Sequence, residues 1–157
     1  MKPVAFSDLS DIELTMFVAS SERHETPDFL LLKYSGHYGI GSNGSDDAKF
    51  IVATSKAAHS AWYTEGVIID FSKLDYRWGD EMSWVFDIGW CPVTGCQHPL
   101  SIIVGDNCVE GLRSLAKDSY ENTCVDSLDK AKAMIRTKAD DYERCLQEWR
   151  DEDSEEL

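Results

Sequence analysis

The stretch from Gly66 to Trp90, GVIIDFSKLDYRWGDEMSWVFDIGW, decides the fold class of this chain. It opens with three consecutive β-branched residues, Val67, Ile68 and Ile69, and the apolar run reaches an acid at Asp70. Such a run is typical of a strand that is covered on both faces, as in a parallel sheet flanked by helices. The apolar run over residues 100–104, LSIIV, predicts a second buried strand of this kind. The sequence therefore predicts an α/β fold.

Patterns on either side complete the expected order β-β-α-β-α-β-α-β-α. The first two strands are expected over residues 12–20 and 29–34 as antiparallel neighbours, and a further short strand over 122–125. A glycine-rich loop or short irregular strand is expected over 36–44. Parallel strands joined by helical crossovers follow from this order, with the N-terminal pair as a mixed edge.

Four helices are expected, each from an N-cap signal followed by apolar residues at helical spacing. The caps are Ser45, Asp80, Asn107 in a capping box with Glu110, and either Asp126 or Ser127. The apolar positions expected on their buried faces are Ile51, Ala58 and Trp62; Met82, Trp84, Val85 and Phe86; Val109, Leu112 and Ala116; and Leu128, Ala131, Ile135, Tyr142, Cys145 and Trp149. At 157 residues the chain fits one mixed, mainly parallel α/β domain over 1–150, followed by an acidic tail over 151–157 that we expect to be disordered.

The charge balance limits the classes of partner. The chain has 29 acidic and 15 basic side chains, a formal charge of −14. Such a charge repels nucleic acids and anionic membranes and attracts basic proteins. The N-terminus lacks the pattern of a signal peptide and no long apolar run is present, which predicts a cytoplasmic protein. In that compartment the five cysteines, at 91, 96, 108, 124 and 145, are expected to be free thiols.

One segment resembles a known family. Residues 69–76, IDFSKLDY, are similar to the strand and turn of STAS domains, the anti-sigma-factor antagonists, and residues 126–131, DSLDKA, resemble the entry to that family's last helix. In element order the resemblance covers roughly residues 45–140. It places Gly79 and Asp80 where such antagonists carry a phosphorylatable serine pair, so it implies a STAS-like regulator that lacks this serine. Asp80 then either mimics a phosphate or is a plain N-cap.

Catalytic or metal chemistry has two candidate locations. Cys91, Cys96 and His98, with Cys108 as a fourth ligand, offer thiolates and an imidazole for zinc or for a thiol-dependent enzyme. Separate reduced cysteines are the interpretation we favour, with a Cys91–Cys96 disulfide as a further alternative. His37 with Asp46 is the other candidate pair, whereas His59 is expected to face solvent. Neither candidate forms a specific motif, so the sequence predicts no enzyme, no metal and no cofactor.

Aromatic and acidic residues in the decisive stretch favour binding. Trp78 and Trp90 lie beside turns, whereas Trp84 is expected to pack into the core from its helix. Exposed tryptophans provide an anchor for a partner protein, and acids around them attract a basic partner electrostatically. The expected partner-binding residues are Asp75, Tyr76, Trp78, Asp80, Glu81, Asp87 and Trp90. The leading hypothesis is a non-enzymatic protein that neutralises or regulates a basic partner, as a toxin-neutralising immunity protein does; the STAS-like regulator and the small thiol- or metal-dependent enzyme are the alternatives.

Overall fold

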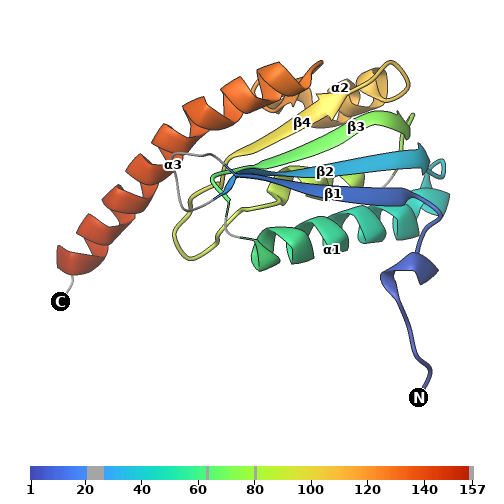
Figure 1. Ribbon diagram of the computed structural model, residues 1–157, viewed down its shortest axis with the longest axis horizontal. Coiled ribbons are helices and arrows are strands. Elements are labelled where there is room, and N and C mark those ends of the chain that lie inside the picture. Colours follow the sequence, from blue (N-terminus) through green and yellow to red (C-terminus); the bar gives the residue numbers. More distant parts are fainter. Residues whose placement is uncertain (21–26, 63, 80, 156–157) are drawn as a thin grey trace.

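A single mixed sheet organises the molecule (Figure 1). The computed structural model describes residues 1–20, 27–62, 64–79 and 81–155. Its strands, in the spatial order β1-β2-β3-β4-β5, are β1 (Glu13–Ser20), β2 (Pro27–His37), β3 (Val67–Asp75), β4 (Leu100–Val104) and β5 (Cys124–Val125). β1 is antiparallel to β2, and all later pairs are parallel. The predicted α/β class and the mainly parallel sheet are confirmed.

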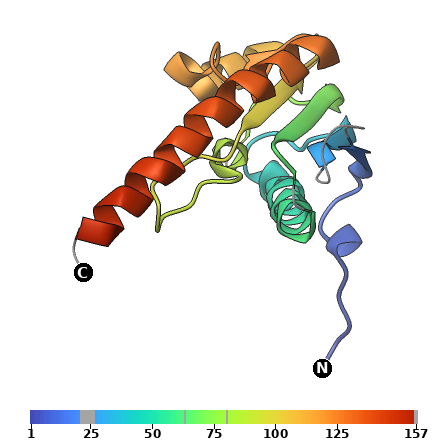
Figure 2. The same ribbon diagram turned by 60° about the vertical axis from the view of Figure 1, so that its left-hand side comes forward.

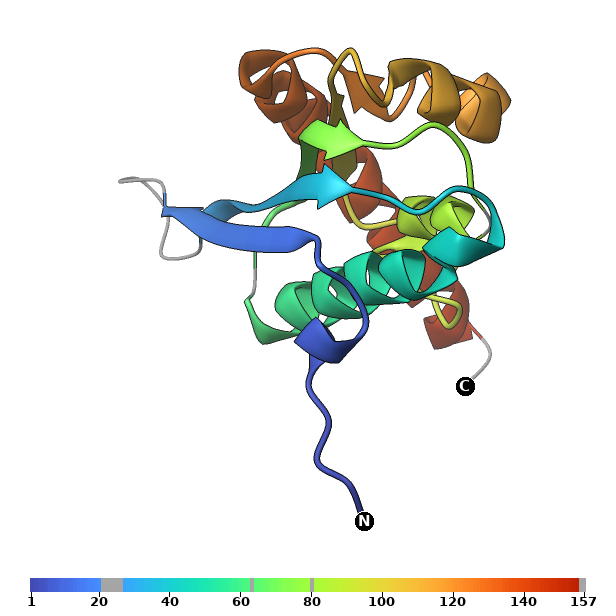
Figure 3. The same cartoon turned by 90° about the vertical axis from the view of Figure 1, so that its right-hand side faces the viewer.

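Helices cover both faces of this sheet (Figures 1 and 3). One face packs against α1 (Ser45–Ala61), the 3-10 helix η3 (Met82–Asp87) and α2 (Val109–Ala116), and the other packs against α3 (Leu128–Glu155). Short 3-10 turns complete the fold: η1 (Phe6–Asp8), η2 (Ser42–Gly44) and η4 (Lys117–Ser119). Within the described residues, no helix combines the length and the apolarity that a membrane crossing needs.

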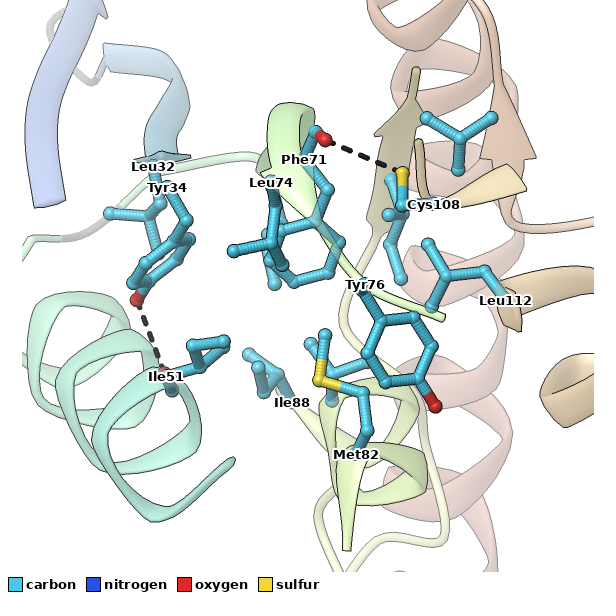
Figure 4. Packing of buried hydrophobic residues seen from close by; sticks show 14 of the residues in the cluster. Leu32, Tyr34, Ile51, Phe71, Leu74, Tyr76, Met82, Ile88, Cys108 and Leu112 are labelled. Atoms are coloured by element: carbon cyan, nitrogen blue, oxygen red, sulfur yellow. Dashed lines mark hydrogen bonds between the residues drawn. The ribbon is translucent and has the colours of Figure 1, made fainter. Parts of the chain in front are cut away.

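The central strand β3 shows how the apolar run that begins at Val67 is buried in the sheet. Successive side chains of a strand point to opposite faces. Val67, Ile69 and Phe71 accordingly pack into the larger core with α1 and α2, whereas Ile68 packs against Ala131 on α3. Figure 4 shows the larger core, in which the buried Tyr34 hydroxyl donates a hydrogen bond to the Ile51 carbonyl of α1 at 3.1 Å. Both faces of β3 are therefore buried, as its continuous apolar run predicts.

Two predicted details of α1 are wrong. Gly44, not Ser45, occupies the N-cap position, because Ser45 is already helical and its hydroxyl donates to Glu81 Oε2 at 2.9 Å. At the other end the helix stops at Ala61, and Trp62 takes an extended conformation. The indole of Trp62 therefore leaves the buried face that Ile51 and Ala58 share and is exposed.

The segment after β3 also differs from the prediction. Residues 82–87 form a 3-10 helix, whose period of three places Met82 and Val85 together on the buried side. The same period turns Trp84 outward, so the expectation that Trp84 packs in the core is wrong.

The two last helices begin or end differently from the sequence expectation. Cys108 occupies the N-cap of α2, while the Asn107 carbonyl accepts the Tyr76 N–H at 3.2 Å, so the predicted capping box does not form. α3 continues to Glu155, so residues 151–155 extend a helix where a disordered tail was expected.

Candidate functional site

The carboxyl end of β3 presents an exposed tryptophan. Immediately beyond the strand, the Trp78 carbonyl accepts the Gly41 N–H at 3.3 Å, which ties this turn to the loop before α1. Gly41 has φ +62°, and a Cβ there would lie 2.9 Å from the Trp78 ring. Only glycine meets both demands without strain. The Trp78 indole lies against Gly41, and Trp78 is 59% exposed. Ile40, which precedes Gly41, is exposed as well.

Two shallow hollows lie between the turn and the start of α2, and Trp78 lines the first of them. They measure about 340 and 310 Å³ and share Arg77, Glu110 and Gly111 in their walls. A Cβ on Gly111 would meet the Arg77 carbonyl oxygen at 2.4 Å, so glycine is what allows the helix to approach the turn this closely. We call this region the Trp78 surface; its residues are Ile40, Asp75, Arg77, Trp78, Asp106, Glu110 and Leu115.

The structure brings together only part of the predicted partner-binding set. Asp75 and Trp78 belong to the Trp78 surface, whereas Tyr76 is 2% exposed and packs edge-on against Tyr38. Its ring is part of the core and also lines both hollows, so Tyr76 is not an exposed anchor, and its contact with a partner stays a prediction. The Glu81 carboxylate accepts the Ser45 hydroxyl and holds the start of α1. Asp80 lies outside the described residues.

Two further predicted residues lie elsewhere. Asp87 ends η3, and Trp90 belongs to a hairpin that leads into the start of β4, where it bridges to Gln97. This hairpin is at the amino end of the sheet, and β3 alone spans about 26 Å between the two ends at about 3.3 Å per residue. The structure therefore separates Trp90 from Trp78, although both are exposed.

The sequence reasoning missed Asp106 and Glu110, which follow the next parallel strand. The signal was available, because the carboxyl ends of adjacent parallel strands meet at one edge of a sheet, where α/β proteins commonly bind ligands. The candidate pair of His37 and Asp46 is wrong for a related reason. Parallel pairing of β2 with β3 places His37 opposite Asp75, and the His37 Nδ1 lies 3.0 Å from the Asp75 carboxylate, while Asp46 pairs with Lys49.

The amino end of the sheet holds a disulfide between Cys96 in the hairpin and Cys145 on α3. The prediction of five free thiols is therefore wrong for these two residues, and so is the alternative Cys91–Cys96 bond. The sequence could not reveal the pairing, because the partners are 49 residues apart and meet only when α3 packs across the sheet. Stable disulfides are typical of oxidising compartments, which disagrees with the reducing cytosol expected from the sequence.

The cysteines do not assemble as zinc ligands in the described part of the chain, where no group of three or more suitable side chains gathers. Cys96 is in the disulfide, and Cys108 is buried with its thiol donating to the Phe71 carbonyl at 3.4 Å (Figure 4). Burial raises the pKa of Cys108, and it raises the pKa of Cys124 to about 12. Both thiols therefore stay protonated at neutral pH.

Beside the disulfide lies a pair of half-buried imidazoles. The rings of His59 and His98 are 4.5 Å apart, so the prediction that His59 faces solvent is wrong. Tyr142 of α3 meets His98 edge-on at 5.2 Å. The Thr64 carbonyl accepts the His98 Nε2–H at 3.0 Å, which leaves the buried Nδ1 as the bare nitrogen of a neutral ring. Burial, and then the neighbouring His59, lower the pKa of His98 to about 4.

A groove of about 970 Å³ runs from His98 along α3. Its walls carry charges of both signs, among them Lys132, Arg136 and Glu143, together with the apolar Phe29 and Leu146. The mixed lining gives the groove no single ligand chemistry, in contrast to the Trp78 surface with its three carboxylates and one guanidinium.

Comparison of the chain with models of protein families, with curated proteins and with solved structures finds no match. The STAS resemblance, the immunity-protein hypothesis and the absence of enzymatic activity stay predictions.

Proposed function

We propose that this chain binds a basic protein through the Trp78 surface. The observation that carries the proposal is Trp78, 59% exposed, on a hollow that Arg77 and Glu110 line, with a second hollow bordered by Asp75, Asp106 and Glu110 adjoining it. A large exposed aromatic ring next to concave surface is the usual form of an interface anchor. Its fixed position on Gly41 means that little conformational freedom is lost when a partner covers it.

Charge supports the choice of a basic partner. Among the described residues that line the second hollow, Asp75, Asp106 and Glu110 outnumber Arg77, in a chain whose formal charge is −14. Complementary charge raises the association rate of two proteins and contributes less to the lifetime of the complex. The finer proposal is that the chain neutralises its partner by covering it, as a toxin-neutralising immunity protein does, and that it acts without catalysis.

The test begins with capture of partners from a lysate of the source organism on the immobilised chain. We expect a basic protein that is retained by the wild type and lost with Trp78→Ala. Trp90→Ala is the matched control, because Trp90 is also about half exposed, at 51%, but lies at the other end of the sheet. Loss of capture with Trp90→Ala alone would contradict the proposed surface.

Binding kinetics with the captured partner then separate the anchor from the charges. Truncation of an interface anchor costs about 2 kcal/mol of binding free energy, which corresponds to roughly 30-fold weaker binding. For Trp78→Ala we expect this loss to appear as faster dissociation. Reversal of Asp75, Asp106 and Glu110 to lysine should instead slow association by about tenfold or more at low salt. Neutralisation is tested by adding wild type or Trp78→Ala to an assay of the partner's own toxicity or activity.

A further inference from the structure

The hairpin over residues 90–97 places a third cysteine, Cys91, opposite Cys96 of the disulfide. Trp90 and Gln97 form an antiparallel bridge, and inside it the Cys91 N–H donates to the Cys96 carbonyl at 3.1 Å. The ladder ends at this pair, because the Cys91 carbonyl accepts the Gly95 N–H at 2.9 Å. Facing residues of an antiparallel ladder have Cα atoms about 4.5–5.5 Å apart and side chains on the same face. That separation lies within the range that a disulfide bridges without backbone movement.

We infer that Cys91 is an exchange thiol for the Cys96–Cys145 disulfide. The Cys91 thiolate attacks Sγ of Cys96, a Cys91–Cys96 bond forms, and the Cys96–Cys145 bond breaks. Cys145 leaves as a thiolate and takes up a proton from water. One disulfide and three free thiols are present before and after the step, so it consumes neither oxidant nor reductant. The inference is independent of the proposed partner binding.

Thr94, at the tip of the hairpin, prepares Cys91 for this step. Hydrogen bonding from the Thr94 hydroxyl, and then from the Thr94 and Val93 backbone, lowers the pKa of Cys91. The same Thr94 oxygen accepts the Cys96 N–H at 3.2 Å, so one side chain fixes both cysteines. Cys91 is partly exposed, whereas the other free thiols, Cys108 and Cys124, are buried with raised pKa values. Because only a thiolate attacks, Cys91 is the reactive one.

The exchange affects the C-terminal half of α3. Figure 2 shows this half of the helix extending away from the sheet, past the hairpin. Nearby, α3 is held by the Lys138 ammonium on the Leu100 carbonyl at 2.7 Å and by the contact of Tyr142 with His98. Exchange removes the covalent tie at Cys145 and leaves these contacts in place. The helix beyond residue 145 then becomes free to fray.

The test traps the exchanged form of the full chain. Protein purified without reductant is held at pH 7, 8 and 9 for up to about a day, since uncatalysed rearrangement takes minutes to hours. A short pulse of maleimide and mass-spectrometric mapping then identify the linked and the labelled cysteines. We expect chains with a Cys91–Cys96 bond and a labelled Cys145, forming about tenfold faster per pH unit below the Cys91 pKa. Hydrogen exchange of amides 146–155 should accelerate in proportion.

Variants make the result decisive. Cys91→Ser should leave Cys145 unlabelled, and Thr94→Ala should slow the exchange, whereas the matched control Cys124→Ser should behave as the wild type. The inference is overturned if no Cys91–Cys96 bond forms in the wild type at pH 9. Labelling of Cys145 at the wild-type rate in Cys91→Ser would overturn it as well, and so would a wild type in which Cys91, Cys96 and Cys145 are all labelled at the start.

Discussion

The two ends of the parallel sheet are built by the same strands, yet their side chains serve opposite purposes. The carboxyl end leaves Trp78 exposed above shallow acidic hollows. The amino end is fastened by the Cys96–Cys145 disulfide and by imidazoles packed between α1 and α3. We infer that residues at the first end can change with little loss of stability, whereas those at the second contribute to holding the molecule together.

The largest effect on stability is expected in β3, the strand that runs between the two ends. Ile69 is fully buried, and Ile69→Asp places an unpaired carboxylate in the larger core. We expect the free energy of unfolding to fall by about 3–5 kcal/mol, measured by denaturant titration. Ile40→Asp on the exposed Trp78 surface is the control and should change it by less than about 0.5 kcal/mol. Similar losses from both changes would remove the contrast between buried strand and open surface.

The central strand was also the part that the sequence predicted best. A continuous apolar run identifies such a strand without any tertiary information, because burial on both faces requires apolar residues at successive positions. The turn after it was predicted less well: Tyr76 and Trp78 are both aromatic and two residues apart, and only the packing of Tyr38 decides that one is buried and the other exposed.

Long-range pairing accounts for most of the remaining errors. The disulfide joins residues 49 apart, and His59 meets His98 from a different element. No local pattern of residues encodes such contacts. The grouping of Asp106 and Glu110 with Trp78 likewise depends on which strands are neighbours, which the order of elements suggests but does not determine.

The next largest effect is expected at the amino end, from the disulfide. Its removal in Cys145→Ser opens a loop of 49 residues, for which the loss of chain constraint is worth about 4 kcal/mol, with measured cases commonly at about 2–4. Denaturant titration under non-reducing conditions measures the loss. Cys91→Ser, which leaves the bond in place, should keep the wild-type stability. If Cys145→Ser were as stable as Cys91→Ser, the amino end would not be the fastened one.

A smaller effect should depend on pH. His98 has a pKa of about 4 in the folded chain against about 6.5 when unfolded, so the unfolded state binds more protons between these values. Stability is therefore retained above about pH 6.5 and lost as the pH falls towards 4. The loss is at most about 3 kcal/mol, and less to the extent that water reaches the ring. His98→Gln should flatten this part of the curve relative to wild type in urea titrations at pH 7, 5.5 and 4.

His37→Gln, at the carboxyl end of the sheet, serves as the control for the dependence of stability on pH. His37 is an exposed imidazole at the carboxyl end, beside Asp75. Because His37→Gln leaves the buried pair intact, the steep loss of stability below pH 6.5 should persist. A curve for His98→Gln that matches the one for His37→Gln would show that burial of His98 does not govern the acid sensitivity.

The smallest effect is expected from the acidic end of α3. Deleting residues 151–157 removes five acids and no cation, so the formal charge changes from −14 to −9. In Figure 1 this end of α3 lies on the side of the molecule away from the end of β3. Exposed charges are screened over about 8 Å at physiological salt, a distance much shorter than the sheet. The deletion should therefore slow association with the basic partner by less than about twofold, against about tenfold for reversal of Asp75, Asp106 and Glu110. If the deletion slowed association as much as the reversal did, the partner would be attracted by the acidic helix end, and the carboxyl end of the sheet would lose its distinction as the binding surface.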